Sequence, residues 1–220
     1  MLSFLKKAPV FKGKNLVFRI IIPIIAFISS IFIFAFVIVG IKSNYSLVTA
    51  TPAHLVFKSL FGASLLICSI LYALAKSVPL SGICGFFGFI ASLFPLIQSI
   101  NDYFAAKSFA EQFSMTQDFS SYWTTTGVYA LYALLCLSVF LYSVGLFPYP
   151  VPILVLSALS FLATIFITIE RIVAYNLEPF SIMCFAYAAL AVVIPVLFVI
   201  STKKPTANKR KSEIMNNEKV

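Results

Sequence analysis

Residues 79–102 form the stretch that most constrains how this chain can fold. The stretch reads PLSGICGFFGFIASLFPLIQSIND and carries no charged residue before Asp102. At about 1.5 Å per residue, a helix of this length can cross a hydrocarbon core of roughly 30 Å. Its small and polar residues recur in steps of four and three, which places them on one helix face. They are Ser81, Gly85, Gly88, Ser92, Pro95, Ser99 and Asp102.

This small-residue face predicts close packing against another helix. In lipid, helices associate through van der Waals contact, and small residues let two backbones approach each other. We therefore expect Gly85, Gly88 and Ser92 to contact a neighbouring helix, with this span at the centre of a bundle. The large aromatic side chains, such as Phe86 and Phe87, lie mostly on the other faces.

The composition of the whole chain also indicates a membrane protein. Of the 220 residues, 61% are apolar and 10% are charged, whereas a soluble domain usually carries about 25% charged residues. The net charge of +9 gathers before the first apolar run and after the last one, which is typical of cytoplasmic segments that flank membrane spans. Because the basic residues have this placement and no base-reading motif occurs, nucleic-acid binding is not expected.

Six apolar runs predict an all-α polytopic membrane protein, a bundle of six transmembrane helices. The expected spans cover residues 16–41, 52–75, 79–101, 126–147, 152–175 and 179–201. Residues 1–15 are a basic N-terminus, and residues 202–220 are a basic tail that we expect to be disordered. Six spans with two basic ends place both termini in the cytoplasm. The excess of lysine over arginine favours a bacterial plasma membrane.

The longest connection, residues 103–125, has the features of a membrane-surface segment. Phe104, Phe109 and Phe113 approximate a helical stripe beside charged residues, which predicts a short amphipathic helix in the interface. Tyr122 and Trp123 then mark the interfacial aromatic belt before the fourth span. With both termini inside, this connection is expected outside the membrane.

Residues 79–95 and 179–195 suggest an internal repeat at an offset of 100. Proline, serine, cysteine, alanine and proline coincide without a gap. Chance coincidence is the alternative, because membrane helices draw on few residue types and the first and fourth spans match poorly. A true repeat of three spans would give two inverted halves, a recurring transporter design with the substrate site between the halves. Pro95 and Pro195 would then kink corresponding helices.

Ionisable residues inside spans are costly in lipid and are therefore candidate binding residues. Glu170 and Arg171 lie about one turn inside the outer end of the fifth span. With Lys58 and Asp102 they are expected in the outer half of the membrane. The alternative is that these charges only stabilise helix ends by snorkelling or by pairing, for example Arg171 with Glu178.

A polar stripe on the fifth span parallels the one on the third. Ser157, Ser160, Thr164, Thr168 and Arg171 step by three and four residues, so they share a helix face. We expect both stripes to line a common outer cavity with Arg171 and Asp102 at its mouth. The candidate ligand-binding residues are Lys58, Ser99, Asp102, Thr164, Thr168, Glu170 and Arg171.

Motifs of enzymes and of metal sites are absent from the sequence. There is no HExxH, Walker or GxGxxG motif, and there is one histidine, His54. The four cysteines lie within apolar runs without CxxC spacing, so we expect buried packing and neither a metal nor a cofactor. They are Cys68, Cys84, Cys136 and Cys184.

We therefore expect a non-enzymatic membrane protein that binds or translocates a small solute through an outward-facing polar site. The alternative is a structural or regulatory subunit of a larger membrane complex. Such a subunit would contact a membrane-protein partner, or a second copy of the chain, through its glycine and alanine faces. In both cases the lipid bilayer surrounds the protein.

Overall fold

The computed structural model describes residues 8–12, 16–42, 52–74, 78–116, 118–175 and 192–203. Within the helices, the side chains of Lys58, Thr168, Glu170 and Arg171 are among those outside the described set. The chain is mostly helical, which confirms the all-α class.

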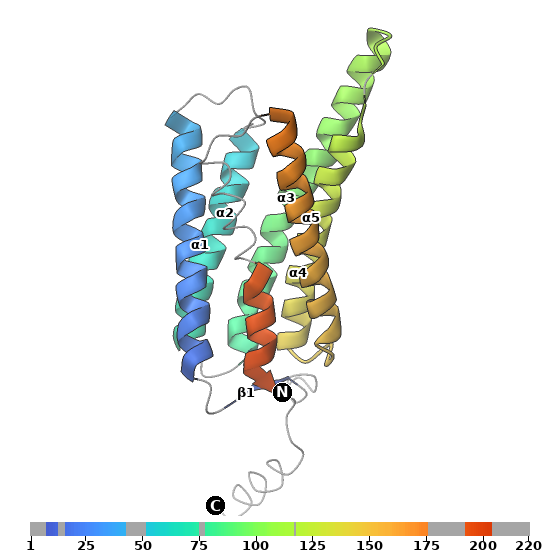
Figure 1. Cartoon of the computed structure of the whole chain (residues 1–220). Helices are drawn as coiled ribbons and strands as arrows, with labels where there is room; N and C mark the ends of the chain where they lie inside the picture. Colours follow the sequence, from blue (N-terminus) through green and yellow to red (C-terminus); the bar gives the residue numbers. More distant parts are fainter. Residues whose placement is uncertain are drawn as a thin grey trace, which may run out of the picture.

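Long helices that contact their neighbours in chain order build the structure (Figure 1). The helices are α1 (Leu16–Lys42), α2 (Pro52–Leu74), α3 (Val78–Gln112), α4 (Ser120–Ser143), α5 (Val151–Tyr175) and a short C-terminal helix (Val192–Ser201). The contact between α3 and α4 is the most extensive, followed by that between α1 and α2. Figure 1 shows α3 and α4 as a hairpin that projects beyond the other helices.

The helix bounds agree with the expected spans for α1, α2 and α5, and differ for α3 and α4. α3 continues to Gln112 instead of ending near residue 101, so the expected separate interfacial helix is the last part of α3. Residues 102–112 contain no glycine or proline that would end a helix, and the pair Lys107–Glu111, 3.9 Å apart, has helical i,i+4 spacing. α4 likewise begins at Ser120 rather than at 126. Of the expected sixth span, only its end lies in the described residues.

The turn between α3 and α4 is closed by local hydrogen bonds. Ser114 adopts a φ of 51°, which reverses the chain after α3. The Asp118 carboxylate accepts hydrogen bonds from the backbone N–H of Ser120 at 2.8 Å and from its hydroxyl at 2.9 Å. These two bonds lower the pKa of Asp118, and an anion at this place is favoured by the positive N-terminal end of α4.

Two short strands join the two ends of the described chain. β1 (Val10–Phe11) pairs with β2 (Thr202–Lys203) in antiparallel register. Beside them the Lys12 ammonium donates to the Ile200 carbonyl at 2.7 Å, where a cation at a helix C-terminus is favourable. The sequence predicts neither strand, because each is two residues long and forms only by pairing with a distant segment.

Many large apolar side chains of this bundle lie at its surface, although others, such as Ile22 and Ile33, are buried in its core. Large apolar side chains such as Ile24, Leu162 and Phe166 are exposed, whereas serines such as Ser30 and Ser160 are fully buried. Helices that pack in lipid have this arrangement, with small residues at their contacts and large apolar residues outside. α3 and most of α4 are long and apolar enough to cross a membrane, and the other helices contain shorter apolar segments.

Candidate functional site

The small-residue face of α3 lies against α4. A Cβ atom placed on Gly85 would be 2.9 Å from the Cys136 carbonyl oxygen and 2.9 Å from the Phe140 nitrogen, so only glycine fits between the two backbones. On Gly88 it would be 3.0 Å from the Cys136 sulfur. Ser92 is buried on the same face and donates to the Gly88 carbonyl at 2.7 Å. This contact fixes the position of α4 against α3.

The two prolines expected to kink helices occupy different surroundings. Pro95 is buried on the small-residue face, and α3 continues through it to Gln112. Pro195 lies in the C-terminal helix and lines an interior cavity. The halves expected to be repeats cannot be superposed over 176–191, which lie outside the described residues.

The space that we call the interior cavity has a volume of about 90 Å³ and is open on part of its surface. Its wall combines residues of α1, α2, α3, α4 and the C-terminal helix, and it is largely apolar. Three cysteines contribute to it from three helices, namely Cys68 from α2, Cys84 from α3 and Cys136 from α4. Gly85 and Gly88 also belong to this wall, so the tight α3–α4 contact forms one side of the cavity.

The hydroxyl groups of the cavity wall already have hydrogen-bond partners. Ser64 and Ser81 donate to the carbonyl oxygens three residues earlier in their own helices, at 2.7 and 2.8 Å. Tyr72 bonds Ser201 at 2.6 Å, and Tyr132 bonds Thr164 at 2.6 Å. The remaining side-chain heteroatoms among the described lining residues are the sulfurs of the three cysteines.

Two of these thiols are neighbours. The side chains of Cys68 and Cys84 lie close enough to interact with each other, and Cys136 lies near Cys68. Cys136 also lies near Ser92. All three cysteines are free of disulfides.

Aromatic rings connect the wall of the cavity to β1 and β2. Tyr72 and Phe198 line the cavity, and Tyr72 makes edge contacts with Phe11, at 5.4 Å between ring centroids, and with Phe198, at 6.1 Å. Tyr142 contacts Phe198 at 6.2 Å and bonds the Thr202 hydroxyl at 2.8 Å. We call Phe11, Tyr72, Tyr142 and Phe198 the terminal seal, because they tie the paired strands to the bundle.

The candidate residues of the outer stripes make contacts with α4 instead of with each other. Ser99 donates to the Leu96 carbonyl and bonds Thr126 at 3.0 Å. Thr164 bonds Tyr132. Thr126 and Tyr132 are six residues apart and so point to different sides of α4. The described contacts therefore separate the two stripes rather than joining them at one cavity.

Among the charged candidate residues, Asp102 is the one whose side chain the structure describes. Asp102 accepts a hydrogen bond from Gln98 of its own helix at 2.7 Å. The side chains of Lys58, Thr168, Glu170 and Arg171 lie outside the described set, so the pairing of Arg171 with Asp102 or Glu178 stays a prediction.

The sequence patterns predicted buried packing for each cysteine but did not predict that Cys68 and Cys84 are neighbours. A signal was present, because α2 and α3 are antiparallel neighbours joined at residues 75–77. Cys68 lies eight residues before residue 76 and Cys84 eight residues after it. Equal distances from the turn of a helical hairpin place two residues at the same level.

In the described residues, no three histidine, cysteine or acidic side chains are close enough together to hold one metal ion. The site is therefore a small apolar cavity with two neighbouring thiols and a third thiol in its wall. Comparisons with protein-family models, with curated proteins and with solved structures give no match to this chain.

Proposed function

We propose that this chain is a six-span membrane protein that binds a small solute in its interior cavity. In this proposal it resides in a bacterial plasma membrane with both termini in the cytoplasm, and it is not an enzyme. The apolar outer surface and the buried serines support the membrane location. The basic ends support the orientation.

The observation that carries the proposal is the interior cavity itself. About 90 Å³ exceeds the roughly 30 Å³ that one water molecule occupies in the liquid and is less than the 150 Å³ of an engineered cavity that binds benzene. The solute that fits is therefore an ion or a molecule of a few heavy atoms. Under the proposed orientation the cavity lies in the inner half of the membrane, next to the terminal seal, rather than at the expected outward-facing site.

Filling the cavity tests the proposal. Val139 lines the cavity, and Val139→Phe should fill part of it. Val155 on α5 is 51% exposed, so Val155→Phe adds the same bulk on the outer surface. With xenon as the probe and ¹²⁹Xe NMR of the detergent-solubilised protein as the readout, the wild type and Val155→Phe should bind xenon and Val139→Phe should not. Equal binding by all three proteins would contradict a ligand site in this cavity.

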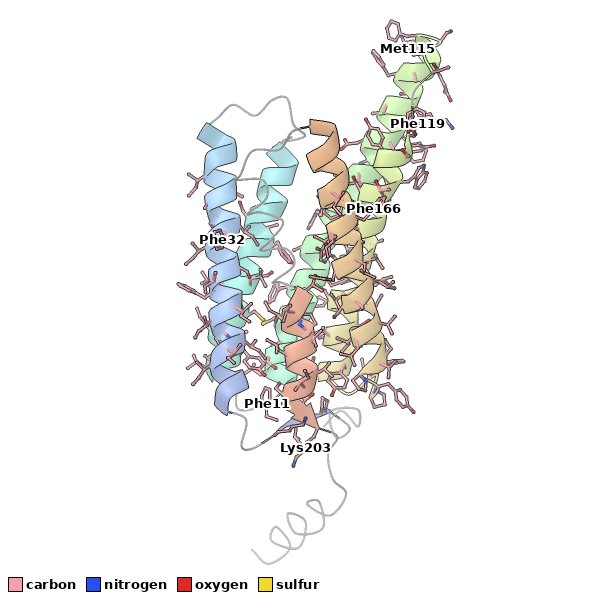
Figure 2. All side chains as sticks on the ribbon, in the orientation of Figure 1. Phe11, Phe32, Met115, Phe119, Phe166 and Lys203 are labelled. Carbon is pink, nitrogen blue, oxygen red and sulfur yellow. The ribbon has the colours of Figure 1, made fainter. Side chains whose placement is uncertain are left out.

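A second function, that of a subunit in a larger membrane complex, is supported by the projecting α3–α4 hairpin. Its end exposes large apolar side chains although it extends beyond the other helices (Figure 2). They are Phe104, Phe109, Phe113, Met115 and Trp123. Exposed apolar patches of this kind mark interaction sites when they occur outside lipid.

Purification in a mild detergent separates the two functions. A subunit should elute with a stoichiometric partner or as an oligomer, and Phe109→Ala with Phe113→Ala should release it. The matched control is Leu159→Ala with Leu162→Ala, two exposed residues of α5. Elution of the unaltered chain as a monomer without a partner would contradict the subunit function.

A further inference from the structure

We infer that the interior cavity binds a soft monovalent metal cation, of the class of Cu(I) and Ag(I), between the sulfurs of Cys68 and Cys84. The inference rests on the proposed function, because it names the class of solute that the cavity takes. It differs from the packing role that the sequence predicts for these cysteines.

The geometry of the two thiols carries the first step. They come from adjacent antiparallel helices, lie at the same level of the α2–α3 hairpin and are neighbours in the cavity wall. A cation in the cavity could therefore reach both sulfurs without a change in how the helices pack. Because α2 and α3 are held as neighbours by their short connection, the two sulfurs are held together before the cation binds.

The chemistry of the wall selects the kind of cation. Among the described lining residues there is no carboxylate, amide side chain or imidazole. The serine and tyrosine hydroxyls are already engaged in hydrogen bonds. Hard cations such as Mg²⁺ and Ca²⁺ need several oxygen ligands, and structural zinc needs four ligands. Thiolate ligands select soft cations such as Cu(I), which accept two sulfurs.

Binding of the cation is coupled to the release of protons. A thiol that coordinates a metal ion is deprotonated, so both sulfurs would bind the cation as thiolates. Two protons then leave the cavity as one cation enters.

Cys136 lies in the cavity wall but is not a ligand of the cation in this proposal. It lies on the α4 side of the cavity, near Ser92. The three cysteines do not form one metal-binding group. Removal of Cys136 should therefore leave the two-sulfur site intact, which separates this proposal from a three-cysteine site.

A silver titration tests the inference with the full-length protein in detergent. Ag(I) is added against a competing chelating dye at fixed pH, and proton release is measured in parallel. The wild type should bind one Ag(I) tightly at this site and release two protons for it. The double variant Cys136→Ser with Cys184→Ser should change the affinity for Ag(I) by less than about 10-fold. This change is smaller than the roughly 10–100-fold loss that follows when a residue hydrogen-bonded to a metal ligand is removed. The double variant Cys68→Ser with Cys84→Ser should lose more than about 100-fold in affinity for Ag(I), because both ligands are removed. Tight binding by this last variant would overturn the inference.

Thiol protection gives a second readout that does not depend on the variants folding. Ag(I) should protect Cys68 and Cys84 of the wild type from maleimide, as read by mass spectrometry of peptides. Protection of neither cysteine would overturn the inference. The xenon experiment distinguishes the proposal that the cavity binds a solute from the proposal that the solute is a metal cation. Xenon binding that is lost in Val139→Phe, together with unprotected thiols, would retain the cavity as a binding site and reject the metal cation.

Discussion

α4 is contacted by α3 on one side and by α5 on another, and the two contacts differ in kind. Against α3 the backbones approach so closely that Gly85 has room for no Cβ atom. Against α5 the contact includes a hydrogen bond between long and short polar side chains, Tyr132 and Thr164. The α3 contact is also the more extensive of the two.

The difference shows two ways in which a bundle with an apolar outer surface can join its helices. Close approach through glycine gains van der Waals contact along both backbones. Side-chain hydrogen bonds between membrane helices contribute only about 0.6 kcal/mol on average. The stripe of Thr164 also contains Ser157 and Ser160, whose buried hydroxyls have no hydrogen-bond partner among the described residues. We therefore expect the α3–α4 contact to hold the bundle and the α4–α5 contact to be the weaker one.

The largest effect should follow from adding bulk at the α3–α4 contact. Gly85→Leu must separate α3 from the α4 backbone, because the nearest atoms are backbone atoms that cannot rotate away. Overpacking of this kind costs about 1–3 kcal/mol or more. Thermal unfolding and size-exclusion profiles in detergent measure it. Phe87→Leu, at an exposed position of the same helix, is the control and should be mild. Similar losses in both variants would show that this face does not hold the bundle.

A smaller effect should follow at Gly88, where the obstacle is a side chain. A Cβ atom there would meet the Cys136 sulfur, so Gly88→Ala should destabilise less than Gly85→Leu. Cys136→Ala should relieve the clash. The double-mutant cycle should give a favourable coupling of about 0.5–3 kcal/mol, the range for residues in contact. Strict additivity of the two changes would mean that Gly88 and Cys136 do not touch.

On the α5 side, Tyr132→Phe should cost about 0.6 kcal/mol and no more than about 1.7 kcal/mol, as for other hydrogen bonds between membrane helices. The ring that packs between the helices stays, and only the bond to Thr164 is lost. Thr164→Val provides the partner for a double-mutant cycle, read by thermal unfolding. A loss as large as that of Gly85→Leu would invert the ranking of the two contacts.

The smallest effect should come from Ser157→Ala. A buried hydroxyl without a partner contributes no hydrogen bond, so its removal should change stability by less than about 0.5 kcal/mol or increase it slightly. Ser92→Ala is the matched control, because it removes the hydrogen bond to the Gly88 carbonyl. If Ser157→Ala destabilised the protein more than Ser92→Ala, Ser157 would have a partner that stabilises it.

Local patterns predicted the parts of the fold that depend on neighbouring residues. The bounds of α1, α2 and α5 follow from apolar runs and from prolines and polar turns at their ends. The small-residue face of α3 follows from steps of three and four residues. The extension of α3 to Gln112 was missed because charged and aromatic residues suggested a surface helix, although nothing in that segment ends a helix.

The sequence by itself determined that this protein is helical and that Gly85 and Gly88 belong to a packing face. Only the tertiary structure decided that this face meets α4, that β1 pairs with β2 and that Cys68 and Cys84 are neighbours in the wall of a cavity. The reason is physical. A helix face is set by residues within a turn or two, whereas its neighbour is selected by packing between segments far apart in the chain. Several neighbours can satisfy one small-residue face, so the pattern alone does not choose among them.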